Sequence, residues 1–235
     1  MNNLGNNHIT NMKSDDALLE NAVSKAVSRI NNDYYGKIPD NWTIDLGSAK
    51  ISFKNIREEM LKMGYSAAKA NAYYGGPSSI ITDGPIVYIT IRKDGKKIMK
   101  PIFLGEMKKQ GTNDKRLAEG KSRQAIGNAG TDRVAKNFMI ASDYCYLHDR
   151  TFFPYNVFLH GCDFSTTDIT TTTLAKLKPF FGKLNKLNPY FDKEVIKKGG
   201  SCFYQDKDYT EEQLENYCYK CCELGIKHYM DKYKE

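Results

Sequence analysis

The stretch from Ile86 to Leu104 constrains the fold most, because it predicts a β-hairpin. Residues 86–91 read IVYITI, a run of β-branched and aromatic side chains that is typical of a strand. Residues 93–96 carry an Asp-Gly turn, and residues 97–104 predict the returning strand. Pro101 cannot donate to a strand ladder, so it indicates an edge or a bulge. With helices predicted before and after it and a further strand downstream, the hairpin suggests an α/β sheet with helices on its faces.

Charged side chains stand at one end of the predicted hairpin. Asp83 precedes the first strand, and Glu106 and Lys108 follow in the second. Alternate residues of a strand share a face, so Glu106 and Lys108 are expected to point the same way and Met107 into the core. Carboxylates bind hard divalent cations, and a lysine beside a metal-activated water suits phosphodiester hydrolysis. Taken alone, this short pattern also fits an ordinary surface hairpin.

Support comes from four motifs in a fixed order. They are SSIITDGPIV at 78–87, EMKKQG at 106–111, GNAGTDR at 127–133 and FPYNVFLHG at 153–161. In this order they resemble the EcoRI-type type II restriction endonucleases of the PD-(D/E)XK nuclease superfamily. The resemblance covers roughly residues 76–165. It implies a restriction-endonuclease-like α/β fold, in which helices flank a central mixed β-sheet.

The resemblance also implies an activity. Asp83, Glu106 and Lys108 would be catalytic, and Asp83, Glu106 and the Met107 carbonyl would hold Mg²⁺. The substrate would be palindromic double-stranded DNA bound by a homodimer, with an AATT core and 5′ overhangs. Two alternatives stay open: a repair or recombination nuclease of the same superfamily, and a non-catalytic DNA-binding module. The intact Asp83, Glu106 and Lys108 argue against the second.

A helix that begins near Gly127 is expected to read the DNA. Its N-terminus offers backbone N–H groups to phosphate. The amide of Asn128 suits an adenine edge, and the methyl group of Ala129 suits thymine. The resemblance links both residues, with Gln110 and Arg133, to the inner A·T pairs. The DNA contacts expected in total are Gln110, Gly127, Asn128, Ala129, Arg133, Arg116, Arg123 and Lys136. The alternatives are a capped surface helix and a solvated basic loop.

Three positions depart from the family pattern. Thr82 stands where the superfamily usually has proline, which we expect to be tolerated because that proline shapes a turn and binds no metal. The 127–133 segment is one residue longer, and Asp132 replaces glutamate. Thr173 falls where the family has an arginine that reads the outer base pair, so the outer specificity is not carried over.

Composition agrees with a DNA-binding enzyme. The 235 residues carry a formal net charge of +7, which favours a polyanionic partner. No apolar run is long enough to span a membrane, and no signal peptide is recognisable. Six cysteines favour reduced thiols and a cytoplasmic location. We expect a flexible arm at residues 1–13 and a single nuclease domain at 14–235.

Helix signals recur along the chain. One helix is expected from a cap at Ser14 or Asp15 to about Asn31, and a second from a cap at Asn55. The third should run from near Gly127 through Ala141, followed by a buried strand over residues 153–160. A capping box at Thr210 and Gln213 predicts a C-terminal helix to Lys232.

Three cysteines lie on one side of that last helix. Cys218, Cys221 and Cys222 are three and four residues apart, which places them on one face. A buried core stripe is the preferred interpretation. A zinc site completed by Cys202 and His228 is the alternative, although no second Cys-x-x-Cys motif exists.

Overall fold

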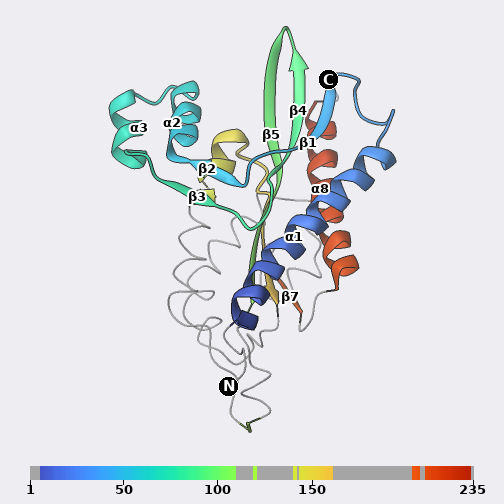
Figure 1. Ribbon diagram of the computed structural model, residues 1–235. Coiled ribbons are helices and arrows are strands. Elements are labelled where there is room, and N and C mark those ends of the chain that lie inside the picture. Colours follow the sequence, from blue (N-terminus) through green and yellow to red (C-terminus); the bar gives the residue numbers. More distant parts are fainter. Residues whose placement is uncertain are drawn as a thin grey trace.

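The computed structural model describes residues 6–109, 119–120, 140–141, 143–160, 203–206 and 210–233 (Figure 1). The helices that it bounds are α1 (Asn6–Asp33), α2 (Phe53–Lys62), α3 (Ala67–Tyr74) and α8 (Glu211–Lys232). The strands are β1 (Trp42–Leu46), β2 (Lys50–Ser52), β3 (Ser79–Ile81), β4 (Val87–Lys93), β5 (Lys96–Lys109), β6 (Tyr155–His160) and β7 (Phe203–Asp206). Residues 140–141 and 143–148 are also helical.

The main sheet is mixed. Within the described residues its order is β1-β4-β5-β6-β7. The strands β1, β4 and β5 pair antiparallel, whereas β5, β6 and β7 pair parallel. The predicted turn joins β4 to β5, with Asp94 at φ 52° and Gly95 at φ 70°, the positive values that a two-residue hairpin turn requires. The strand predicted over residues 153–160 is confirmed as β6. The mixed α/β fold is thus confirmed.

A β-bulge interrupts the hairpin where Pro101 lies. Val87 pairs with Phe103, but the next residue, Tyr88, pairs with Pro101. The bulge predicted from Pro101 is confirmed, and it lets a residue without an N–H group sit inside a central strand. Beyond Phe103, β5 continues beside β6 and no longer beside β4. That edge of β5 is therefore open to the segment that precedes β4.

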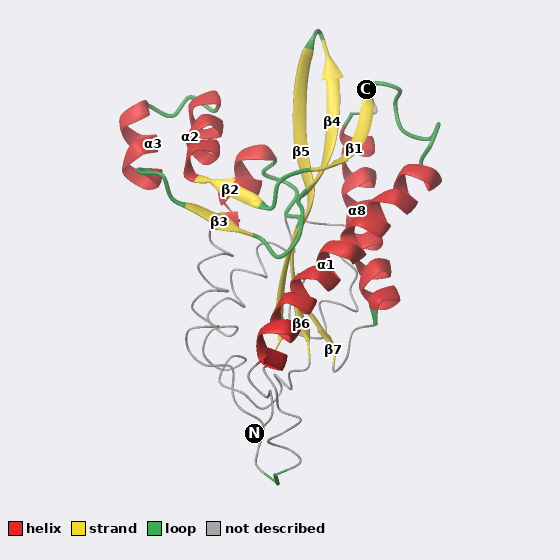
Figure 2. Cartoon of the chain, in the orientation of Figure 1, coloured by secondary structure: helices red, strands yellow, loops and turns green. Residues whose placement is uncertain are grey.

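Helices cover both faces of the hairpin (Figure 2). On one face, α1 and α8 pack on β4 and β5, and the predicted apolar side of α1 is buried there, with Leu19, Ala22, Val23, Ala26 and Ile30 fully inaccessible. On the other face, a second core joins α2, α3, β2, β3 and the helical residues 140–141 and 143–148. The two cores meet across the β4–β5 hairpin, which contributes residues to both.

Two predicted helix starts are wrong. α1 begins at Asn6 and not at Ser14 or Asp15. α2 is capped by Ser52, whose hydroxyl oxygen accepts the N–H of Asn55, so Asn55 lies inside the first turn. Ser52 is the last residue of β2, and its extended conformation (ψ 148°) suits the N-cap position. The cap at Thr210 and its capping box with Gln213 are confirmed.

α8 is fixed to the rest of the fold by burial and by one buried carboxylate. Cys218, Cys221 and Cys222 are buried in the core, as the stripe interpretation predicts. Among the described residues, no three His, Cys, Asp or Glu side chains form a metal-binding group, and Cys202 lies outside them. His228 instead lies 3.1 Å from Asp149.

Lys232 also pairs with Asp149, at 2.9 Å. Burial raises the pKa of Asp149, but the hydrogen bonds from His228, Lys232 and Thr151 outweigh burial and hold it well below its usual range. Asp149 directly follows the helical residues 143–148, so these bonds join that segment to α8. None of the helices in the described part is long and apolar enough to cross a membrane.

Candidate active site

The segment that carries Asp83 is fixed by the residue before it. The N–H of Thr82 donates to the Ala49 carbonyl at 2.9 Å. The Thr82 hydroxyl lies 2.9 Å from the carbonyls of both Ala49 and Gly84, and its single proton is shared between them. Thr82 is buried, so these bonds are shielded from water. Threonine thus fixes the turn by hydrogen bonds, whereas proline would do so through its ring.

Asp83 bridges β5 on both sides of Glu106. Its N–H donates to the Gly105 carbonyl at 3.0 Å. Its carboxylate oxygen Oδ2 accepts the N–H of Met107 at 2.8 Å. The contact is possible because β4 starts only at Val87 and leaves this edge of β5 open. These two hydrogen bonds, to the backbone of Gly105 and of Met107, place Asp83 beside Glu106, as the sequence predicts.

Glu106 and Met107 lie on opposite faces of β5. Met107 is 5% exposed and belongs to the core beneath α1 and α8, as predicted. Glu106, 1% exposed, follows Leu104 on the face that carries the second core. Lys108 pairs with Leu159 of β6. Its side chain lies outside the described part, so a face shared with Glu106 stays a prediction.

Two glycines let α1 approach this segment. Gly84 has φ +116°, and a Cβ atom there would lie 3.6 Å from Leu19 Cγ. A Cβ atom on Gly105 would lie 3.1 Å from Leu19 Cδ2 and from the Phe103 ring. Leu19 and Gly105 are therefore part of the site, although neither was predicted there from the sequence. The sequence signal for this close approach was a glycine directly next to each candidate carboxylate.

The chain is similar in sequence to one family of known enzymes. The sequence model described as Restriction endonuclease EcoRI matches residues 7–191, a range that includes all four motifs. The chain belongs to the EcoRI restriction endonuclease family. No curated protein matched. The chain is accordingly a type II site-specific deoxyribonuclease that binds DNA and requires a divalent metal.

The donor set of this EcoRI-family site fits such a metal. Asp83 and Glu106 offer carboxylate oxygens, and the Met107 carbonyl is an oxygen donor on the same strand. Oxygen is the ligand that hard divalent cations prefer. Substrate phosphate and water would supply further oxygen ligands.

The residues expected to read DNA lie outside the described part of this EcoRI-family enzyme. They are Gln110, Arg116, Arg123, Gly127, Asn128, Ala129, Arg133 and Lys136. Thr173 lies outside it as well. Of the predicted recognition helix only residues 140–141 are described, and they are helical. Ala141 packs into the second core together with Tyr144 and Cys145 of the helical residues 143–148.

Proposed function

We propose that Asp83, Glu106 and Lys108 catalyse Mg²⁺-dependent hydrolysis of DNA phosphodiesters. The observation that supports this most is the pair of hydrogen bonds by which Asp83 bridges Gly105 and Met107 across Glu106. These bonds hold the two carboxylates in a fixed relation before substrate arrives. Preorganised groups of this kind avoid reorganisation during the reaction.

Each residue then has a distinct role. Asp83, Glu106 and the Met107 carbonyl would hold Mg²⁺. The bound ion would polarise the scissile phosphate and lower the pKa of the attacking water. The Lys108 ammonium group would orient that water, accept its proton after deprotonation, or stabilise the charge that builds on phosphate. The Met107 N–H orients the Asp83 carboxylate, and the burial of Glu106 excludes competing bulk water.

Sequence specificity rests on the family resemblance. We propose a palindromic site with a central AATT, cut to leave 5′ overhangs with 5′-phosphate and 3′-hydroxyl ends. Asn128 and Gln110 are chemically suited to adenine edges, and Ala129 to a thymine methyl. Arg133 completes this set, although the extra residue before it changes its spacing from the family pattern.

A twofold-symmetric enzyme matches a palindromic site, so we propose a homodimer in which each subunit cuts one strand. We further propose that residues 14–235 act as one nuclease domain and that residues 1–13, which include the start of α1, extend from it as an arm. The single domain is supported by the β4–β5 hairpin, which both cores share. The cytoplasm, where DNA is accessible, is the proposed location.

Digestion of phage DNA with Mg²⁺ tests the function directly. The proposal expects discrete bands, and none when EDTA replaces the metal. A smear would favour a repair or recombination nuclease, and no cutting would favour a non-catalytic DNA-binding module. Sequencing the cut ends tests specificity separately. Overhangs other than 5′-AATT would refute the AATT core but leave the nuclease assignment intact.

Asp83→Ala is the matched chemical control. It should abolish cleavage while the folded protein still binds DNA, because Asp83 supplies a metal ligand and no recognition contact. Removal of a negative charge near phosphate should preserve or tighten metal-free binding. A variant that cuts at the wild-type rate with Mg²⁺ would show that the metal site lies elsewhere.

A further inference from the structure

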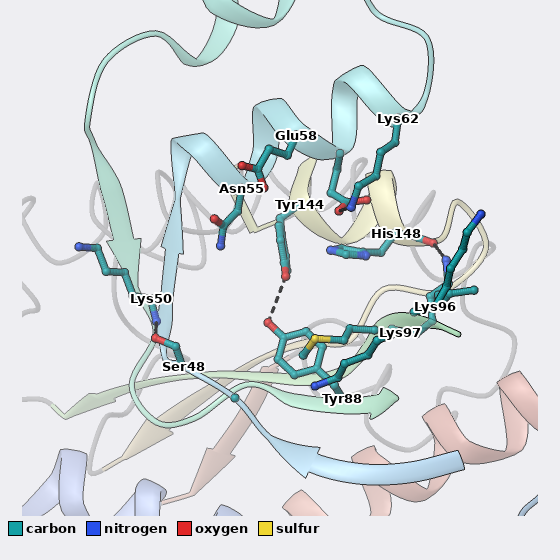
Figure 3. Close-up of a pocket in the computed structure, with 15 residues that line it drawn as sticks. Ser48, Lys50, Asn55, Glu58, Lys62, Tyr88, Lys96, Lys97, Tyr144 and His148 are labelled. Atoms are coloured by element: carbon teal, nitrogen blue, oxygen red, sulfur yellow. Dashed lines mark hydrogen bonds and ion pairs between the residues drawn. The ribbon is translucent and has the colours of Figure 1, made fainter. Parts of the chain in front are cut away.

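A large cavity lies between α2, the helical residues 143–148 and the β4–β5 hairpin (Figure 3). Its volume is about 900 Å³. The hydroxyl groups of Tyr88 and Tyr144 meet at 3.0 Å across it. A cavity of this size falls in the range of small-molecule and cofactor sites, and nothing in the proposed reaction uses it.

The cavity is lined by more positive than negative charge. Among the described residues, five lysines line it against two glutamates, Glu58 and Glu59. Both glutamates already have partners, since Glu59 pairs with Lys62 and Glu58 with Lys54. Among the described residues, no carboxylate lies within ion-pair distance of the other four lysines. These are Lys50, Lys96, Lys97 and Lys100.

Lys100 is held inside the cavity wall. It is half-buried, and its Nζ donates to the carbonyl of His148. Burial lowers the pKa of Lys100, and the charge of Asp149 offsets this effect only in part. Burial also lowers the pKa of His148 to about 4, so its ring is neutral at pH 7. Within its described lining, the positive charge of the cavity therefore comes from the lysines.

The cavity and Glu106 share one face of β5. The bulge at Pro101 shifts the alternation, so that Met99 in the cavity wall and Leu104 lie on the face that carries Glu106. Lys100 is six residues from Glu106, a span of about 20 Å at about 3.3 Å per residue. At the other rim, Ser48 and Lys50 flank Ala49, whose carbonyl anchors Thr82.

We propose that this lysine-lined cavity binds phosphate groups. Lysine ammonium groups are common phosphate ligands and need no fixed geometry. The placement favours a backbone phosphate of the bound DNA, about six base pairs beyond the scissile one at about 3.4 Å per pair. Free phosphate or a nucleotide is the other source of the same group. The DNA source rests on the proposed function, whereas phosphate binding itself does not.

The first experiment uses inorganic phosphate without metal. The ¹⁵N-labelled protein is titrated with phosphate, and with chloride at equal ionic strength, and amide shifts are followed at Tyr88, Tyr144 and His148. We expect saturable shifts with phosphate alone. The double variant Lys96→Gln/Lys97→Gln should weaken this binding by about tenfold or more, the loss of about 1.4 kcal/mol. Both side chains are exposed on the hairpin, so the variant should fold.

A matched control variant removes two lysine charges outside the cavity. Lys69→Gln/Lys93→Gln replaces two exposed lysines, on α3 and on the same hairpin, that do not line the cavity. Its phosphate titration should equal that of the wild type. Equal titrations for all three proteins, or no saturable shifts in the wild type, would overturn the proposal.

The second experiment distinguishes the sources. DNA binding is measured on two duplexes with one recognition site, flanked by about 3 or about 12 base pairs. Counted outward from each scissile phosphate, away from the centre of the site, only the longer duplex spans the roughly six base pairs to the cavity. If DNA is the source, the Lys96/Lys97 variant loses affinity for the longer duplex only, and its salt slope falls by about 2. Phosphate shifts without this length effect identify free phosphate or nucleotide. If wild-type enzyme fails to cut phage DNA, the proposed function fails, but the phosphate titration still decides the cavity.

Discussion

Gly84→Ala tests whether the turn at Asp83 positions the site. Gly84 has φ +116°, a conformation that L-residues rarely adopt. The added methyl group itself would meet Leu19 Cγ at 3.6 Å and Glu20 Cα at 3.8 Å, which are ordinary contact distances. The cost therefore comes from backbone strain, about 1–3 kcal/mol of unfolding free energy.

In the variant, the backbone at residue 84 would rotate away from this conformation to relieve the strain. Rotation at Gly84 disturbs the two bonds that join Asp83 to Gly105 and Met107, at 3.0 and 2.8 Å. A displacement of about 1 Å at a reacting group lowers the rate by about 10²-fold. We expect a loss of that size in single-turnover cleavage at saturating enzyme, with DNA affinity unchanged without metal.

Gly36→Ala provides the control. Gly36 also has a positive φ, +69°, but a Cβ atom there would meet nothing within 4 Å. Urea denaturation should show a loss of about 1–2 kcal/mol for this variant, with cleavage unchanged. A folded Gly84→Ala enzyme that cuts as fast as wild type would refute the positioning argument. Unchanged stability in Gly84→Ala would refute the strain argument.

Three further changes have defined outcomes. Lys108→Ala should lower single-turnover cleavage by about 10²–10⁴-fold with little change in binding, and an unchanged rate would move the catalytic lysine elsewhere. Gly225→Ala should destabilise the protein in urea by about 1–3 kcal/mol, because its Cβ would lie 2.5 Å from Ile102 Cβ; a neutral result would mean that α8 shifts freely. Asp149→Asn should cost about 1–3 kcal/mol at pH 7, where the carboxylate accepts bonds from His228 and its neighbours. Because the folded-state pKa of Asp149 is lowered, its stabilisation is full above the unfolded value near 4 and is lost as pH falls below it, so the difference from wild type should shrink in acid. A difference that stays constant from pH 7 into that acid range would contradict the assignment.

Local sequence signals predicted the elements well where hydrogen bonding is also local. The Asp-Gly turn and the capping box at Thr210 each involve residues within a few positions of one another. The bulge was signalled by a single residue, Pro101, which lacks an N–H group. The start of α2 was wrong because Ser52 and Asn55 both suit an N-cap, and only the end of β2 decides between them. The start of α1 at Asn6 was missed because residues 2–7 read NNLGNN, and Asn and Gly suit an N-cap as well as Ser14 or Asp15 do.

The sequence by itself determined the family, the hairpin and the identity of the candidate carboxylates. The four motifs are short and contiguous, so their order is visible without a fold. It could not show how Asp83 reaches Gly105 and Met107 on either side of Glu106, since those bonds depend on β4 ending its pairing with β5 at Phe103. Nor could it show that α1 crosses the site at Gly105, because α1 and β5 are far apart in the chain.

The tertiary structure alone decided the face of Glu106 and the lysine cavity. Strict alternation from Met99 would place Glu106 on the opposite side of β5, and one bulge residue reverses this. The cavity lysines come from β2, α2 and β5, and no sequence pattern relates them. The physical reason is the same in each case: periodicity encodes which face is buried, while strand register and helix packing decide which distant faces meet.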